Sequence, residues 1–388
     1  MLALRLTRRA RPGVHLRRAL VATASAGTGF LLLCTLGYAL GHPDSSGPAL
    51  LRLAWCVAPL AATVYLAVAV ARTDPATRPR AGLSAVGLGP GRLMLVSTFA
   101  TAAACSLGSL LAALAFLYLR GVHTGLPFDG AAADLLAAGR PLPAAAVATL
   151  LAVVPVTASA AGALALRPRP ERPADDGDPD RPPAPARVPT GLPWGMALLA
   201  AGLAVEAWAG RGGARSGRLP LPGGLAAGSL GVLVGWALTA VGLAVAGPAL
   251  THHCGRLLSA VRPGGLRLLA GRILQQESRR IGRPLGVLCA VASGVYAALS
   301  LRGGGSPGPA PMTTLGMLLV AGCALATLLV AAVEARQSRA GTKAALLRLG
   351  APPGALRGAV ALRSGALLVL FLPLTWLIAK LAALPLTN

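Results

Sequence analysis

Residues 334–363 read EARQSRAGTKAALLRLGAPPGALRGAVALR and separate two long apolar runs, Thr313–Val333 and Ser364–Leu384. Each run is about long enough to cross a bilayer as a helix. The segment between them is strongly basic, and short basic loops lie on the cytoplasmic side of a membrane. Its basic residues are Arg336, Arg339, Lys343, Arg348, Arg357 and Arg363. We therefore expect the chain to leave the membrane, form a short cytoplasmic segment and return.

The first half of this segment has the periodicity of a helix. Its apolar positions recur at i, i+3, i+4 and i+7, namely Thr342, Ala345, Leu346 and Leu349. Gly350 and Pro352-Pro353 follow and predict the end of the helix, because glycine relaxes the backbone and proline cannot continue the hydrogen-bond ladder. The sequence thus predicts a short amphipathic helix and a rigid elbow before the next membrane helix.

Leu346-Leu347-Arg348-Leu349-Gly350-Ala351, with a basic segment and a membrane helix after it, resembles the signature of FtsX-like ABC permeases. In that family the segment is a cytoplasmic helix that docks on an ATPase subunit. The resemblance implies a docking and elbow site at Ala345, Leu346, Leu349, Gly350, Ala351 and Pro353. The family usually has an Arg-Glu pair before the Gly-Ala and a Glu where the membrane helix begins, whereas this chain has Gly341-Thr342 and Arg363.

The composition is that of an integral membrane protein. The chain has 388 residues, of which 55% are hydrophobic and 12% charged. Its net charge of +24 comes from basic clusters between apolar runs, and only 4% of the residues are aromatic. This pattern favours membrane topology and contact with lipid headgroups, and it argues against a nucleic-acid partner.

The apolar runs predict an all-α fold with about nine membrane helices, within a range of eight to ten. We place them at residues 19–41, 51–71, 93–119, 142–166, 193–209, 223–250, 284–301, 312–333 and 364–384. With a cytoplasmic N-terminus, 28 of the 36 Lys and Arg residues fall in cytoplasmic segments. We therefore predict a multi-pass protein of a bacterial plasma membrane.

A Pro- and Asp-rich stretch, Arg167–Pro189, divides the chain and is expected to be a disordered cytoplasmic linker. We predict a first permease module at 1–166, the linker at 167–191, a spacer helix pair at 192–250 and a second module at 251–388. In the second module, Gly255–Gly282 is amphipathic and is expected to form an interfacial helix before helix 284–301.

The two modules resemble each other at their elbows. Leu83–Leu93 aligns without gaps on Leu346–Leu356, and five of the eleven positions are identical. Both segments follow the second helix of their module, which indicates a parallel repeat. The first-module site residues are then Val86, Gly87, Pro90 and Gly91. The layout is similar to two-module FtsX-like permeases, including peptide-antibiotic exporters, but only a short loop, Arg302–Pro311, stands where many of them carry a large extracytoplasmic domain.

No Walker A motif, G-x-x-x-x-G-K-[ST], occurs in the chain, so ATP hydrolysis is expected on a separate ATPase subunit rather than here. Gly304-Gly305-Ser306-Pro307-Gly308 matches G-x-S-x-G but lies in a turn between membrane helices. His252-His253-Cys254 lacks metal-ligand spacing. We expect no catalytic residues, no cofactor and no metal.

The predicted function is export or extraction of an amphipathic or lipid-like substrate, by one permease or by a homo- or heterodimer of permeases. Two alternatives remain open. A degenerate permease would act as a membrane scaffold or regulator, and a secondary transporter would need an intramembrane acid. Glu206 is the candidate acid; the expectation for it is a place near the outer interface, paired with an Arg or reaching toward water.

Overall fold

The computed structural model describes residues 12–44, 46–73, 90–121, 133, 136, 138–167, 190–212, 230–260, 264–302, 311–338, 340–341, 348 and 353–387. Over these residues the regular structure is helical and contains no strand. The principal helices are α2 (Pro12–Gly41), α3 (Ser46–Trp55), α4 (Val57–Thr73), α6 (Pro90–Leu119), α7 (Ala144–Leu166), α8 (Leu192–Gly212), α9 (Leu230–Ala260), α10 (Gly265–Arg302), α11 (Pro311–Ser338) and α13 (Pro353–Thr387).

Eight segments of the described chain are long and apolar enough to cross a membrane. They confirm the predicted class, an all-α protein with several membrane-length helices, whereas the number nine is not confirmed. The helix that makes the difference is α10, which contains the predicted helix 284–301 and is not among the eight.

The helices divide into two compact units. The first contains α2, α3, α4, α6 and α7, together with α11 as far as Val330. The second contains α8, α9, α10 and α13, together with the end of α11 from Ala331. The predicted spacer pair thus groups with two helices of the predicted second module, while most of α11 groups with the first. The predicted module boundaries remain a prediction.

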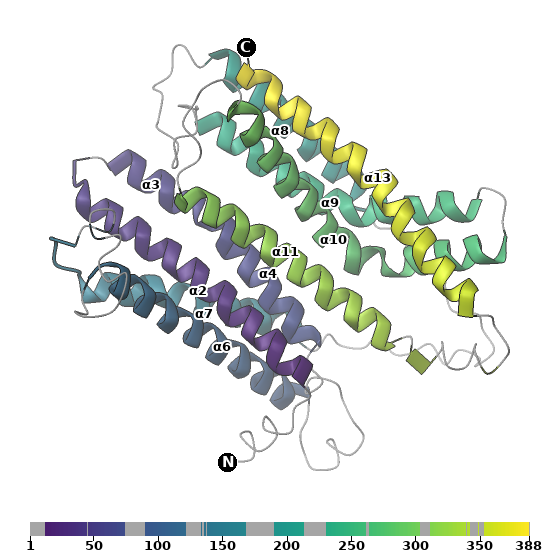
Figure 1. Ribbon diagram of the computed structural model, residues 1–388, viewed down its shortest axis with the longest axis horizontal. Coiled ribbons are helices and arrows are strands. Elements are labelled where there is room, and N and C mark those ends of the chain that lie inside the picture. The colour runs from purple at the N-terminus through teal and green to yellow at the C-terminus, as the bar shows by residue number, and fades with distance from the viewer. Residues whose placement is uncertain are drawn as a thin grey trace. The chain divides into compact units, whose positions relative to one another are not determined.

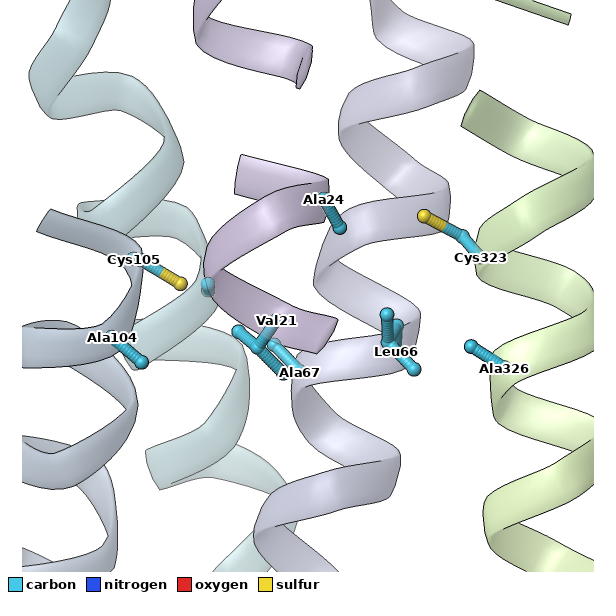
Figure 2. Close-up of a cluster of buried hydrophobic side chains, with 9 residues drawn as sticks. Val21, Ala24, Leu66, Ala67, Ala104, Cys105, Cys323 and Ala326 are labelled. Carbon is cyan, nitrogen blue, oxygen red and sulfur yellow. The ribbon is translucent and has the colours of Figure 1, made fainter. Parts of the chain in front are cut away.

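Small side chains form the centre of the first unit. Figure 2 shows Val21 and Ala24 of α2 and Leu66 of α4 in a cluster to which α6 and α11 add alanines and cysteines. Buried hydroxyl groups join the helices: the Ser25 Oγ donates to the Cys105 carbonyl oxygen at 2.8 Å. Small residues permit this close approach of helices where no hydrophobic effect drives them together.

Glycines form the corresponding contacts in the second unit, in which α9 and α10 lie side by side (Figure 1). Gly286 faces Leu243, Gly282 faces Gly247, and Gly271 faces Gly255, all at backbone contact distance. As residue numbers rise along one helix they fall along the other, so the two helices form an antiparallel hairpin. The hairpin continues through both halves of α10.

This hairpin differs from the expected arrangement of Gly255–Gly282. The structure has one continuous helix of 38 residues, α10, instead of an interfacial helix followed by a separate membrane helix. Pro284 lies inside α10 without ending it. The physical reason is the glycine contact with α9, which holds the amphipathic half against protein at Ala270 and Leu274, while Leu266 and Leu269 remain exposed.

Candidate functional site

Two of the predicted site residues mark the beginnings of helices. Pro90 is the first residue of α6 and Pro353 is the first residue of α13, both earlier than the predicted starts at 93 and 364. Proline suits this position because the first N–H groups of a helix have no acceptor within it, so the N–H that proline lacks costs no hydrogen bond. Its φ angle is also already helical. Gly91 and Gly354 follow, both exposed and with nothing within 4 Å of an added Cβ. Equivalent residues of the two elbow segments therefore begin equivalent helices.

The remaining predicted site residues lie outside the described part of the chain. They are Val86, Gly87, Ala345, Leu346, Leu349, Gly350 and Ala351. Their docking role remains a prediction. What the structure describes is the pair of helices that flank the second elbow, α11 before it and α13 after it.

A buried ion pair holds the first part of α13 against α10. The Arg363 Nη1 donates to the Glu277 Oε2 at 2.8 Å. The two side chains are only 19% and 8% exposed, so the pair is largely removed from water. Arg363 stands where FtsX-like permeases usually have a Glu, and Glu277 supplies the opposite charge from another helix. Sequence patterns did not reveal this partner, although Glu277 is the one acidic residue of the arginine-rich α10.

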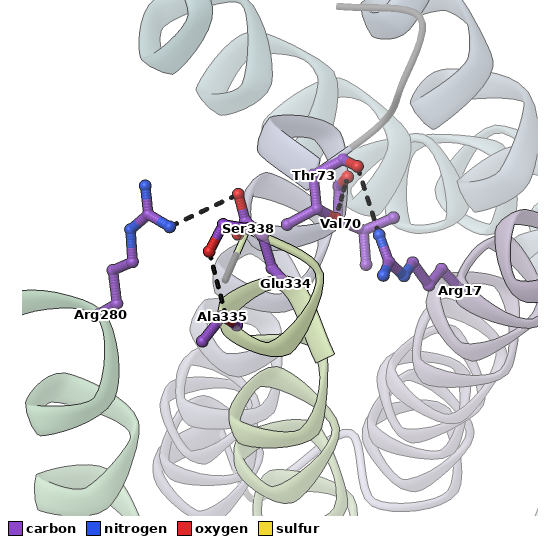
Figure 3. Close-up of polar contacts among 7 residues, drawn as sticks. All are labelled: Arg17, Val70, Thr73, Arg280, Glu334, Ala335 and Ser338. Atoms are coloured by element: carbon purple, nitrogen blue, oxygen red, sulfur yellow. Dashed lines mark hydrogen bonds and ion pairs between the residues drawn. The ribbon is translucent and has the colours of Figure 1, made fainter. Parts of the chain in front are cut away.

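A second ion pair joins α10 to the other flanking helix. The Arg280 Nη1 lies 3.6 Å from the Glu334 Oε1 near the end of α11 (Figure 3). Arg280 is 59% exposed, so water screens this pair far more than the first. Glu277 and Arg280 are three residues apart and thus lie on one side of α10. A single turn of α10 therefore contacts the helices on both sides of the second elbow.

Further contacts hold α13 in place beyond the ion pair. The Leu266 side chain of α10 lies against Gly358, where an added Cβ would be 3.2 Å from Leu266 Cδ1. The Cys254 Sγ of α9 donates to the Ala366 carbonyl oxygen at 3.6 Å. The first half of α13 is thus attached to both helices of the α9–α10 hairpin.

The first unit has a related contact, also drawn in Figure 3. The Arg17 Nη1 of α2 donates at 3.2 Å to the carbonyl oxygen of Thr73, the last residue of α4. The gap-free register that aligns Pro90 with Pro353 also aligns Arg17 with Arg280. In each unit, an arginine at this register position reaches the end of the helix that precedes an elbow. This likeness supports the interpretation of the two halves as a repeat.

Glu206 differs from the sequence expectation. Its side chain is 1% exposed and lies between α8 and α9, where the Thr239 Oγ1 donates to the Glu206 Oε1 at 3.1 Å. The Glu206 Oε2 is buried and has no hydrogen-bond partner among the described residues. Gly235 permits this packing, because an added Cβ there would lie 2.5 Å from the Glu206 Cγ. The acid is enclosed by protein rather than reaching toward water.

Within the described residues, no three His, Cys, Asp or Glu side chains are grouped in a way that could hold a metal ion. Neither elbow flank nor Glu206 brings together a nucleophile and a base. No family model, no curated protein and no solved structure matches the chain.

Proposed function

We propose that the protein is the membrane permease subunit of an FtsX-like ABC transporter, driven by a separate ATPase subunit. In this proposal the chain lies in a bacterial plasma membrane with a cytoplasmic N-terminus. It moves or extracts an amphipathic or lipid-like substrate, alone or as a dimer of permeases. The ATPase docks at the two elbows, Leu83–Leu93 and Leu346–Leu356.

One observation carries the proposal: both elbow segments lead into long apolar helices that begin at equivalent prolines, Pro90 and Pro353. A force applied at either elbow would pass directly into a membrane-length helix. The related arginine contacts of Arg17 and Arg280 next to the helices before the elbows support the same two-module arrangement.

The proposed mechanism follows from this layout. ATP binding by the partner pulls on each elbow, and the membrane-length helix that follows the elbow moves with it. Because α6 and α13 have 30 and 35 residues, a tilt at one end is carried across the full thickness of a bilayer. The chemistry of ATP hydrolysis stays on the partner.

The test places a charge in each predicted docking face. Leu349→Asp and Val86→Asp, singly and together, put a carboxylate into a contact that the proposal treats as dry. Burial of an unpaired carboxylate costs several kcal/mol, which lowers partner affinity by orders of magnitude. We expect the variants to insert normally and to lose co-purification of an ABC ATPase that is co-expressed with them. Ala260→Asp, at the exposed end of α9, is the matched control and should retain it.

Gly350→Val separates motion from docking. A β-branched residue is strained if Gly350 ends the helix with a positive φ angle, so transport should fall while the ATPase still co-purifies. If the double variant Leu349→Asp, Val86→Asp binds the ATPase as well as the unaltered chain, the permease proposal is wrong.

One observation favours the secondary-transporter alternative, namely the burial of Glu206 between two membrane-length helices. Buried acids in membrane helices often mark ion pathways. The alternative predicts uptake driven by an ion gradient in vesicles that contain this chain alone, and loss of that uptake in Glu206→Gln. Vesicles that show no transport until an ATPase is added would exclude it.

A further inference from the structure

The two ion pairs of α10 have opposite polarity. In the first pair, α10 supplies the acid, Glu277, and α13 supplies the arginine. In the second pair, α10 supplies the arginine, Arg280, and α11 supplies the acid. The two helices that flank the second elbow are therefore attached to the same turn of α10 by opposite charges. Helix α13 is attached through a positive charge and α11 through a negative charge. Neither helix can exchange its partner for the other without placing like charges together.

The turn that carries both pairs is firmly held. Gly271 and Gly282 lie on either side of it along α10, and both are at backbone contact with α9. An added Cβ at Gly271 would lie 2.6 Å from the Gly255 carbonyl oxygen, and one at Gly282 would lie 2.5 Å from the Pro248 Cα. Backbone atoms cannot rotate away as side chains do, so α10 moves with α9 as one body.

The two pairs differ in how firmly they hold. Glu277 and Arg363 are 2.8 Å apart and largely buried, so little water screens their attraction. The Arg280 guanidinium is mostly in water and can leave Glu334 at little cost. On the side of α13 the attachment is fixed, and on the side of α11 it is releasable.

We propose that Glu277 and Arg280 are positioning residues that couple the second elbow to the α9–α10 hairpin, with α13 as the fixed arm and α11 as the arm that releases. This inference rests on the proposed permease function, because the coupling would pass a displacement of the elbow on to the α9–α10 hairpin. Displacement of the elbow breaks the Arg280–Glu334 pair first, while the Glu277–Arg363 pair carries α13 and the hairpin together.

The first experiment uses the purified full-length chain alone, in lipid nanodiscs, and measures backbone amide hydrogen exchange. Glu277→Gln keeps the size of the side chain and removes its charge, so exchange should rise in the first turns of α13, residues 353–363. Arg280→Gln should raise exchange only at the end of α11, residues 331–338, and by a smaller factor. Arg279→Gln, the neighbouring exposed arginine, is the matched control and should leave both segments unchanged.

Two further variants separate a specific pair from general loss of structure. The double exchange Glu277→Arg, Arg363→Glu should restore slow exchange in residues 353–363, because it rebuilds the pair with its charges reversed. Arg363→Lys should give an intermediate rate. If Glu277→Gln behaves like Arg279→Gln, or if the reversed pair does not restore protection, the Glu277–Arg363 pair does not fix α13 to α10 and the proposal is wrong.

The second experiment adds the ATPase and compares exchange with and without a non-hydrolysable ATP analogue. In the unaltered chain we expect the nucleotide to raise exchange at residues 331–338, to change exchange in α9 and α10, and to leave residues 353–363 protected. Glu277→Gln should still bind the ATPase yet lose the nucleotide-dependent change in α9 and α10. A full nucleotide response in Glu277→Gln would overturn the coupling role. Failure of the unaltered chain to bind any ATPase would overturn the proposed function, whereas the first experiment would still decide the ion-pair assignments.

Discussion

Gly286→Ala tests the glycine contact that gives the second unit its hairpin. The added Cβ would lie 2.8 Å from the Leu243 carbonyl carbon and 3.0 Å from the Ala244 Cα, with the Leu243 carbonyl oxygen closer still. Carbon atoms in contact are normally about 3.5–4.0 Å apart, so the two backbones must separate by roughly 0.7 Å or more. Leu243 is fully buried, and the separation would loosen its packing as well. Overpacking of this kind costs about 1–3 kcal/mol.

The same substitution at Gly294, also in α10, is the matched control. Nothing lies within 4 Å of a Cβ added at Gly294, so only the change in helix propensity remains. Alanine is favoured over glycine in a helix interior by about 1 kcal/mol. We therefore expect Gly294→Ala to be neutral or stabilising and Gly286→Ala to be destabilising, although both make the same chemical change in the same helix.

The assay is unfolding of the purified chain in mixed detergent micelles, followed by circular dichroism as the denaturing detergent is increased. The unfolding midpoint of Gly286→Ala should fall below that of the unaltered protein, and that of Gly294→Ala should equal or exceed it. If the two variants unfold at the same midpoint, the backbone contact between α9 and α10 does not exist as described. The inference that α9 and α10 move as one body would then be wrong.

Three further predictions address topology, the linker and the buried acid. A cysteine at Ser46 in a Cys-free background should react with an impermeant thiol reagent from outside intact cells, and one at Ser338 should not; labelling at Ser338 would reverse the proposed orientation. Deletion of Ala174–Asp180, which lies outside the described residues, should leave expression and activity nearly intact, and loss of folded protein would show that the acidic run is a docking element. Glu206→Gln keeps an oxygen that can accept from Thr239 and should unfold near the midpoint of the unaltered protein. Glu206→Ala leaves that donor unsatisfied and should lower the free energy of unfolding by about 1–3 kcal/mol. Equal midpoints for the two variants would contradict the buried hydrogen bond.

Much of the helical layout could be predicted from local features of the chain. Length and apolar composition are enough to locate membrane helices, because a segment in lipid must satisfy its backbone groups internally. The elbow pattern also predicted that new helices follow the prolines, although α6 begins three residues earlier than expected, at 90 instead of 93, and α13 begins eleven residues earlier, at 353 instead of 364. These features depend on neighbouring residues alone.

The pairing of helices depends on residues far apart, and there the sequence was not sufficient. Glu277 and Arg363 are separated by 86 positions, and no local period links a lone acid in one helix to an arginine in another. The same holds for Glu206 and Thr239, whose contact requires Gly235 to bring two helices together. Length and apolar composition are properties of single segments, so the sequence by itself determined where most of the membrane-length helices lie. Partners, burial and the continuity of α10 follow from which glycine faces meet, and only the tertiary structure decided that.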